Sequence, residues 1–269
     1  RYEGGNDMST HAFVICAYGQ SPYLEECIAS IELQETAADE VFIATSTPSA
    51  WLESIARKHA LPLHVNSESR GIGADWNFAY EQATADYVTI AHQDDVYLPE
   101  YATHARAMLD SSSDGLIFFS DYAEIRNGET VNDGTLPRVK RRLLAPLAKP
   151  SKARSTHTRR HALAWGNAIC CPAVTFNATN CPIPPFHAGM KSNVDWDTWE
   201  RLSRMEGAFL YDPQPLMLHR IHEASTTTSL IGDSTRTAED LAMLKRFWPT
   251  PIAHAIACVY ARGEAANDL

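Results

Sequence analysis

Two adjacent carboxylates, Asp94 and Asp95, stand shortly after the apolar run 87–91. Neighbouring carboxylates repel each other and are costly to bury unless a cation or hydrogen-bond donors satisfy them. A hard divalent cation that keeps oxygen ligands and binds a diphosphate fits such a pair. Either aspartate can instead cap the turn before Pro99. The pair therefore predicts a metal site or a helix cap.

The elements that position this pair are short apolar runs alternating with segments of helical periodicity. The predicted strands are residues 11–17, 40–45, 63–65 and 87–91, and the predicted helices are residues 23–34, 50–59 and 75–85. Strands alternating with helices imply right-handed crossovers and a mostly parallel sheet. Ligands bind such sheets at the carboxyl ends of the strands, which is where Asp94 and Asp95 stand.

The second half of the sequence is less regular. It predicts helices at 101–109, 196–205, 237–247 and 251–262, and strands at 116–120, 168–176 and 214–220. Residues 127–158 are rich in Gly, Pro, Ser and basic residues, which predicts a long loop or a partly mobile arm. The fold class is α/β, with a sheet flanked by helices and a C-terminal helical extension.

Length and composition exclude several classes of protein. The chain has 269 residues, 45% of them hydrophobic and 21% charged, which suits one large domain with a core. No apolar run approaches the roughly 18 residues that cross a bilayer. Residues 1–7 have no apolar segment typical of a secretory signal, and we expect them to be an unrelated appendage or disordered. A net charge of −10 argues against a general nucleic-acid binder.

The six cysteines are scattered, with no CxxC pair and no zinc-ligand spacing. Cys16 lies in a predicted strand and Cys27 on the apolar face of a predicted helix. Buried, reduced thiols are therefore expected, which predicts a cytoplasmic protein.

Five segments, in the same order, resemble inverting glycosyltransferases of family 2, whose nucleotide-sugar-binding fold is called GT-A. They cover most of the chain, from residue 12 to residue 229. The segments are Phe13-Val14-Ile15-Cys16-Ala17-Tyr18 with the helix that ends at 27–31, Gly71-Ile72-Gly73 with Asn77, Gln93-Asp94-Asp95 with Pro99, Val194-Asp195-Trp196-Asp197, and Leu218-His219-Arg220-Ile221-His222.

The resemblance implies a set of residues that bind the nucleotide sugar. Tyr18 would stack on the base with the Ala17 backbone nearby, and Asp94 would contact the ribose. Arg70 and the turn at Gly71 and Gly73 would lie near the base or the diphosphate. Asn77 would either contact the donor or order a turn. The implied set is Ala17, Tyr18, Thr45, Ser46, Arg70, Gly71, Gly73, Asn77 and Asp94.

The resemblance also implies a metal and a base. Asp95 would bind Mn²⁺ or Mg²⁺, with His222 as a further ligand or a phosphate contact. Asp195 would be the general base, with Asp197 as the alternative. This division agrees with the chemistry, because a cation neutralises the leaving diphosphate and a separate carboxylate takes the proton of the attacking hydroxyl.

Three positions depart from the family pattern. The family's aspartate after the second strand is missing here, and Thr45 or Ser46 would have to bind the base instead. His92 replaces an additional aspartate of the acidic motif and is expected to be structural or to contact metal or donor. Val194 replaces the usual glutamate before Asp195.

Residues 138–160 contain nine Lys or Arg residues and no acidic residue. Three interpretations remain open for this basic segment: a solvated loop, a lid that closes on the diphosphate, or a peripheral contact with an anionic membrane.

The sequence thus predicts a GT-A glycosyltransferase domain at 8–232, with a nucleotide-binding half at about 8–100, an acceptor half at about 101–232 that contains the basic loop 127–160, and an extension at 233–269. We expect a metal-dependent inverting enzyme that moves a sugar from a nucleoside diphosphate, with UDP favoured. The acceptor would be a glycan or a lipid-linked saccharide in cell-surface polysaccharide synthesis, at or near the cytoplasmic membrane face. The alternatives are a nucleotidyltransferase and a non-catalytic nucleotide- or glycan-binding module.

Overall fold

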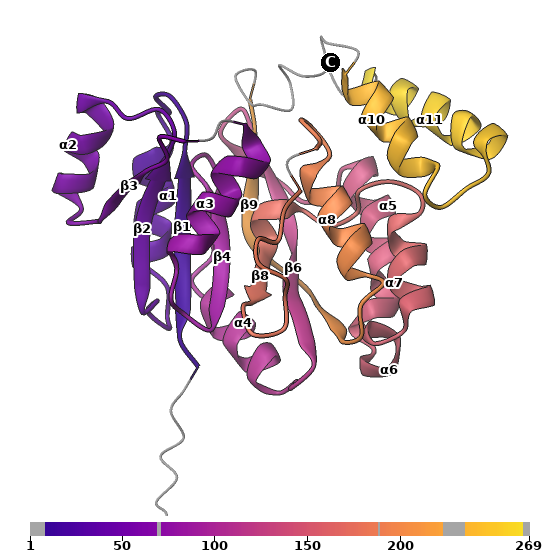
Figure 1. The fold of residues 1–269 in the computed structure, drawn as a ribbon, viewed down its shortest axis with the longest axis horizontal. Helices are drawn as coiled ribbons and strands as arrows, with labels where there is room; N and C mark the ends of the chain where they lie inside the picture. Colours follow the sequence, from indigo (N-terminus) through magenta and orange to yellow (C-terminus); the bar gives the residue numbers. More distant parts are fainter. Residues whose placement is uncertain (1–8, 69–70, 188, 223–234, 266–269) are drawn as a thin grey trace, which may run out of the picture.

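A single mixed sheet forms the centre of the computed structural model, which describes residues 9–68, 71–187, 189–222 and 235–265. The strand order is β3-β2-β1-β4-β8-β6-β9-β5, and β7 pairs with β6 off this path. Helices cover both faces of the sheet (Figure 1). The predicted α/β class is confirmed.

The first four strands are parallel, as the sequence predicts. They are β1 (His11–Ala17), β2 (Glu40–Thr45), β3 (Leu63–Val65) and β4 (Tyr87–His92). Side chains of β1 pack alternately into two core clusters, Val14 on one face and Phe13 and Ile15 on the other. This two-sided burial explains why the strand sequence is continuously apolar instead of alternating.

The second half of the sheet is mixed, so the prediction of a mostly parallel sheet holds only up to β4. Its strands are β5 (Val96–Tyr97), β6 (Gly115–Arg126), β7 (Glu129–Val131), β8 (Val174–Asn177) and β9 (Ala208–Ile221). Strand β8 runs antiparallel to both of its neighbours, β4 and β6, and β5 runs antiparallel to β9. Only β6 and β9 are parallel in this half.

The helices divide between the two faces. The core cluster that contains Val14 includes residues of four helices: α3 (Ile72–Gln82), α7 (Thr156–Leu163), α8 (Val194–Leu202) and α10 (Thr235–Leu244). The core cluster that contains Phe13 and Ile15, on the other face of the sheet, includes residues of α1 (Leu24–Glu32), α2 (Ala50–Lys58) and α4 (Tyr101–Asp110). The predicted C-terminal extension is present as α10 and α11 (Thr250–Ala265), seen at the upper right of Figure 1.

The expected loop at 127–158 is wrong, because most of this segment is helical. After β7 the chain forms α5 (Thr135–Leu144), the 3-10 turn Ala145–Ala148, α6 (Pro150–Ala153) and then α7. Leu144 and Leu147 are buried in the core, so a few apolar anchors fix a segment whose composition suggests a loop. Of the helices in the described part of the chain, none is long and apolar enough to cross a membrane.

Candidate functional site

Strand register brings the ends of β1, β2 and β4 to one edge of the sheet. Ala17 of β1 pairs with Thr45 of β2, and Cys16 pairs with His92 of β4. The residues that follow, Tyr18, Ser46 and the acidic pair, therefore meet at the carboxyl edge. This is the edge at which open α/β sheets bind ligands.

Asp95 is completely buried, and strand pairing determines its surroundings. Val96 of β5 pairs antiparallel with Leu218 of β9, which places Asp95 beside His219 and Arg220. Its Oδ1 accepts a hydrogen bond from the Arg220 backbone N–H at 2.9 Å and lies 3.0 Å from Nδ1 of His219. Its Oδ2 has no hydrogen-bond partner among the described residues.

The charge of Asp95 is maintained by its neighbours. Burial raises the pKa of this carboxyl, but His219, His92 and the backbone N–H of Arg220 oppose that effect, and the pKa ends below its ordinary value. Burial lowers the pKa of His219, but Asp95 more than reverses this and raises it. Asp95 is therefore an ionised carboxylate, and one of its oxygens makes no hydrogen bond with the described residues.

A divalent cation fits this oxygen. A buried carboxylate oxygen without a partner is costly, and a hard cation is a ligand of the right chemistry. His92 lies next to it, with Nδ1 at 3.9 Å from Oδ2. No group of three or more His, Cys, Asp or Glu side chains able to hold a metal occurs in the described part of the chain. Phosphate oxygens and water would have to complete the coordination.

Asp94 faces a different partner from Asp95. Its Oδ2 lies 2.8 Å from Nε2 of His222, and Nε of Arg220 donates to its backbone carbonyl at 2.9 Å. Arg220 also forms an ion pair with Glu26 and lies over the Tyr23 ring, 4.2 Å from its centroid. The structure thus pairs the predicted ligand His222 with Asp94, and Arg220 holds the turn that carries both aspartates.

Asp195 lies at the first turn of α8 and is held by two donors. Nδ2 of Asn167 donates to its Oδ2 at 2.6 Å, and the Trp196 backbone N–H donates to its Oδ1 at 2.8 Å. Burial raises the pKa of Asp195, although these two hydrogen bonds and electrostatic interactions with His92 and Lys140 act against it. A carboxylate with a raised pKa is suited to accept a proton near neutral pH.

His92 interacts with both carboxylates. It is close to Oδ2 of Asp95 and also interacts electrostatically with Asp195. Its ring stacks on Trp76 at 5.1 Å between centroids, and its Nε2 has no hydrogen-bond partner among the described residues. The site therefore combines one buried carboxylate that fits a metal with a second carboxylate that fits a base.

Comparison with known families agrees with this arrangement. A family model described as glycosyl transferase family 2 matches residues 12–173, more than half of the chain. The chain belongs to glycosyltransferase family 2. No curated protein sequence matches it closely enough to serve as a relative.

Solved structures show the same fold at low sequence identity. The mannosyltransferase PcManGT from Pyrobaculum calidifontis, in complex with GDP-Man and Mn²⁺, has a TM-score of 0.62 and 16% identity over 97% of this chain and 76% of its own. Residues 1–349 of TarS from S. aureus give 0.60 and 14%, over 92% and 69%. The glucosyl-3-phosphoglycerate synthase from Mycobacterium tuberculosis, with Mn²⁺ and UDP-glucose, gives 0.57 and 18%, over 88% and 79%.

In this family 2 glycosyltransferase, Tyr18 stands exposed at the end of β1, with 68% of its surface accessible. The side chain of Gln93 holds its backbone on both sides: Nε2 donates to the Tyr18 carbonyl at 2.9 Å, and Oε1 accepts from the Tyr18 N–H at 3.2 Å. The loop after β1 is thus tied to the acidic motif after β4. An exposed ring on a fixed backbone, with the Ala17 backbone beside it, is suited to stack on a base.

A carboxylate of α3, Asp75, lies beside Ser46 at the end of β2. Ser46 Oγ donates to Asp75 Oδ2 at 2.8 Å, and Asn66 Nδ2 donates to Oδ1 at 3.1 Å. Burial raises the pKa of Asp75, with the two hydrogen bonds opposing. Thr45 is instead buried, and its hydroxyl accepts from the Thr47 N–H at 3.0 Å. Ser46 and Asp75 are 29 positions apart in sequence, so their contact becomes visible only when α3 packs on β2.

Two of the predicted donor contacts have structural roles. The Asn77 amide binds the Phe186 backbone through both of its atoms, at 2.8 and 2.9 Å, which uses the groups that would contact a donor. Gly73 is needed for close packing, because a Cβ there would lie 3.2 Å from both the His187 carbonyl and the Val194 side chain. Gly71 has a φ of 107° at the start of α3, which favours glycine. Arg70 lies outside the described residues.

Asp197, the alternative base, is engaged in ion pairs in the structure. Its carboxylate is buried beside two guanidinium groups and an imidazole: Arg246 lies 2.6 Å away, Arg201 3.0 Å and His187 3.4 Å. Helical periodicity explains the difference, since residues two apart on α8 point to different sides of the helix. Asp197 therefore joins α8 to the segment that follows α10, whereas Asp195 interacts with His92 of the acidic motif.

Sequence reasoning missed Lys140, which lies on α5 in the basic segment. Its Nζ donates to Tyr122 Oη at 3.2 Å and lies 5.5 Å from the centre of that ring. Its charge acts on both Asp195 and His219. The only available signal was its place in a basic segment, which the charge pattern could not separate from eight neighbouring cations.

Proposed function

We propose that this protein is a metal-dependent inverting glycosyltransferase that moves a sugar from a nucleoside diphosphate to a saccharide hydroxyl. The observation that supports it is the pair of separate carboxylates: Asp95, ionised with a buried oxygen that has no hydrogen-bond partner among the described residues, and Asp195, with a raised pKa. A nucleotidyltransferase is disfavoured by the family assignment.

The chain's own residues have distinct tasks in this reaction. Asp95 would hold Mn²⁺ or Mg²⁺, which when bound neutralises the charge that builds up on the departing diphosphate. Asp195 accepts the proton from the acceptor hydroxyl as it attacks the anomeric carbon. Attack from the face opposite the leaving group inverts the configuration there. Lys140 adds a positive charge close to Asp195 and to His219, the partner of Asp95.

The donor is a UDP-sugar in this proposal. Tyr18 offers a stacking surface for the base, and Asp75 offers a carboxylate that accepts a hydrogen bond from a ring N–H. Uracil and guanine carry such an N–H in their neutral forms, whereas cytosine and adenine do not. Similar folds have been solved with UDP-glucose and with GDP-Man, which agrees with these two bases.

The acceptor is a glycan or a lipid-linked saccharide of a cell-surface polysaccharide, and we place the reaction in the cytoplasm or at the cytoplasmic membrane face. Reduced thiols support a reducing compartment: all six cysteines lie within the described residues and are free.

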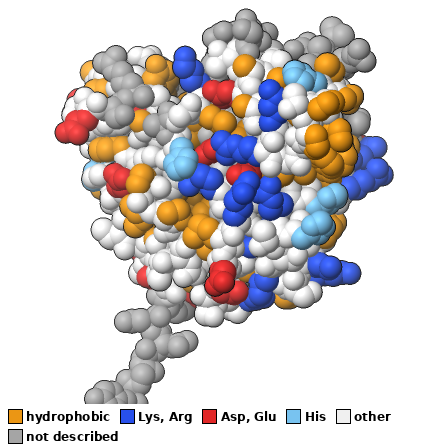
Figure 2. Space-filling model, turned by 45° about the vertical axis from the view of Figure 1, so that its right-hand side comes forward, with side chains coloured by type: hydrophobic (Ala, Val, Ile, Leu, Met, Phe, Trp, Pro, Cys, Tyr) orange, Lys and Arg blue, Asp and Glu red, His pale blue; other side chains and the backbone are white. Residues whose placement is uncertain are grey.

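Membrane contact through residues 138–160 would depend on few charges. Internal partners occupy much of the basic segment: Arg141 pairs with Asp121, Arg154 with Asp114 and Arg160 with Glu200. Figure 2 shows one face of the molecule where blue basic side chains gather with red acidic ones among them. Arg142, Lys149 and Lys152 are exposed, and we propose that these three carry any attraction to anionic lipid.

Calorimetric titration with UDP, GDP, dTDP and CDP, with and without Mn²⁺, tests the donor half of the proposal. We expect metal-dependent UDP binding that is lost in Asp95→Asn. The variant Asp133→Asn, which changes a carboxylate that is 84% exposed, is the matched control. Absence of binding in every condition would contradict the proposal and favour a non-catalytic scaffold.

Product analysis tests the catalytic half. Asp195→Asn should bind UDP normally and lose roughly 10²–10⁴-fold in turnover, because only proton removal is affected. NMR of the product anomeric proton should show inversion relative to the donor. A product with retained configuration would refute the inverting mechanism while leaving the donor site intact.

A further inference from the structure

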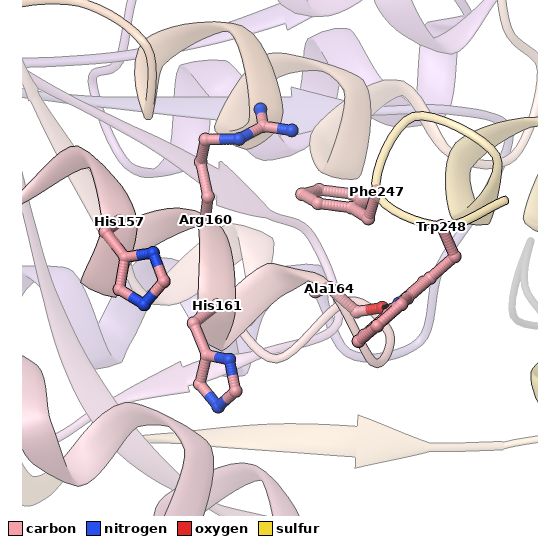
Figure 3. Close-up of a pocket in the computed structure, with 6 residues that line it drawn as sticks. All are labelled: His157, Arg160, His161, Ala164, Phe247 and Trp248. Atoms are coloured by element: carbon pink, nitrogen blue, oxygen red, sulfur yellow. Dashed lines mark hydrogen bonds between the residues drawn. The ribbon is translucent and has the colours of Figure 1, made fainter.

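A cleft outside the carboxylate site opens between α7 and the segment that joins α10 to α11. Its volume is about 200 Å³, and it is lined by His157, Arg160, His161, Ala164, Phe247 and Trp248. Figure 3 shows the two imidazoles on one side, Phe247 and Trp248 on the other, and the Arg160 guanidinium at the top. None of these residues takes part in the chemistry described above.

The lining combines aromatic faces with cationic or donor nitrogen atoms. His157 and His161 are exposed and stacked, with ring centroids 6.3 Å apart. Trp248 packs against Trp165 at 4.7 Å between centroids, and Trp165 keeps 42% of its surface accessible at the edge. Aromatic faces pack against the C–H faces of sugar rings, and the lining offers no carboxylate to repel an anion.

The wall behind the cleft carries excess positive charge. Arg160 lies 4.9 Å from the centre of the Phe247 ring and pairs with the buried Glu200. Glu200 and Asp197 together face four guanidinium groups, which leaves two positive charges uncompensated within this network. The guanidiniums belong to Arg160, Arg201, Arg204 and Arg246. This fixed charge favours an anion in the cleft.

The size of the cleft limits its occupant. The volume of about 200 Å³ is smaller than the roughly 300 Å³ at which drug-sized sites begin. The space therefore suits one sugar ring with a charged substituent.

One residue that lines the cleft, Ala164, lies close in sequence to Asn167, which binds the proposed base. Ala164 lines the cleft, its carbonyl accepts a hydrogen bond from Trp248 Nε1 at 2.6 Å, and Asn167 binds Asp195. Three residues of extended chain span at most about 11 Å, so the cleft lies within reach of a saccharide whose next units extend to Asp195.

We propose that this cleft binds one negatively charged saccharide unit of the acceptor, apart from the unit that reacts. Its class is a sugar with a phosphate or a carboxylate, held by the histidines and Arg160 and packed on Trp248. The description of this unit as part of the acceptor rests on the proposed function, whereas its binding does not.

NMR titration tests the cleft directly, with the Trp165 and Trp248 indole N–H signals as the readout, assigned through Trp165→Phe. The probes are glucose 6-phosphate, glucuronic acid, glucose and inorganic phosphate. We expect saturable shifts with an anionic sugar, and its affinity should fall about tenfold or more in the double variant His157→Ala/His161→Ala. Comparison of the two anionic sugars decides between phosphate and carboxylate.

The controls separate this inference from the proposed function. His64→Ala, on β3 at the far end of the sheet, should bind as the wild type does. Asp95→Asn should lose UDP and keep the anionic sugar, whereas the double variant His157→Ala/His161→Ala should weaken the sugar and keep UDP. No saturable shift, equal affinity for glucose, equal affinity for inorganic phosphate, or unchanged binding in the double variant would overturn the proposal.

Discussion

Asn167 and Asp195 form a short side-chain pair, with Nδ2 of Asn167 only 2.6 Å from Oδ2 of Asp195. Oδ1 of the same amide is buried and has no partner among the described residues. One amide thus orients the carboxylate with its donor and has an acceptor atom left for a substrate hydroxyl. Asn167 comes from the chain after α7 and Asp195 from the start of α8, so the pair joins two separate segments at the proposed base.

Removing this amide should shift the pH dependence of the reaction. Asn167 stabilises the ionised form of Asp195, so Asn167→Ala raises the pKa of the carboxyl further. Because the base works only when ionised, the acidic limb of the kcat/KM profile should move up by about one pH unit. The UDP affinity, measured by calorimetry, should stay the same. A lower rate with an unshifted profile would show that Asn167 does not act through Asp195.

The Asp75 carboxylate should determine the preference for the base. In Asp75→Asn the side chain keeps its shape but loses its charge, so a hydrogen bond from a ring N–H should weaken by about 1.5–3 kcal/mol, or roughly 10–100-fold in UDP affinity. CDP, whose neutral base lacks this N–H, should be affected far less. Competition between UDP and CDP measures the ratio.

The control for this variant is Ser46→Ala, which removes one donor to Asp75 and keeps the carboxylate. We expect it to weaken UDP binding by less than Asp75→Asn does. Equal losses of UDP and CDP in Asp75→Asn would show a general disturbance of the α3 packing instead of recognition of the base.

Local sequence patterns predicted the first half of the fold closely. Strands β1, β2 and β3 have the predicted boundaries, because each is a short apolar run covered on both faces. The helices at 135–163 were missed, since their signal comes from a few buried leucines within a polar, basic and proline-containing segment.

Several contacts in the site join residues that are far apart in sequence, and these contacts could not be predicted from local patterns. Asp95 could be identified as a ligand candidate from its neighbours in sequence, but its pairing with His219 spans 124 residues and depends on the β5–β9 register. The choice between Asp195 and Asp197 depends on which side of α8 faces the sheet edge. The contact of Asp75 with Ser46 joins α3 to the end of β2, which no local motif indicates.

Three exposed bases of the basic segment, the ones proposed above to attract anionic lipid, should control any membrane binding. Each Lys or Arg near an anionic surface contributes about 1 kcal/mol, so the triple variant Arg142→Gln/Lys149→Gln/Lys152→Gln should lose about 3 kcal/mol, more than 100-fold in partitioning. Sedimentation with phosphatidylserine vesicles at low salt measures this. Arg154→Gln, which removes a base already paired with Asp114, is the control. Failure of the wild type to sediment would refute membrane contact.

Burial of His11 should make stability depend on pH. Its Nε2 lies 2.8 Å from Thr89 Oγ1, and burial, with help from the positive charge of Arg106, lowers its pKa to about 3. The unfolded chain binds this proton at about pH 6.5, so the stabilising effect is complete above that pH and is lost as the pH falls towards 3. Between about pH 7.5 and about pH 5 the wild type should lose about 2 kcal/mol more unfolding free energy than His11→Phe, because 1.5 pH units below the unfolded pKa correspond to about 2 kcal/mol. Urea unfolding at the two pH values gives this difference, in which titrations common to both proteins cancel. Equal losses in the two proteins would mean that His11 keeps its ordinary proton affinity in the fold.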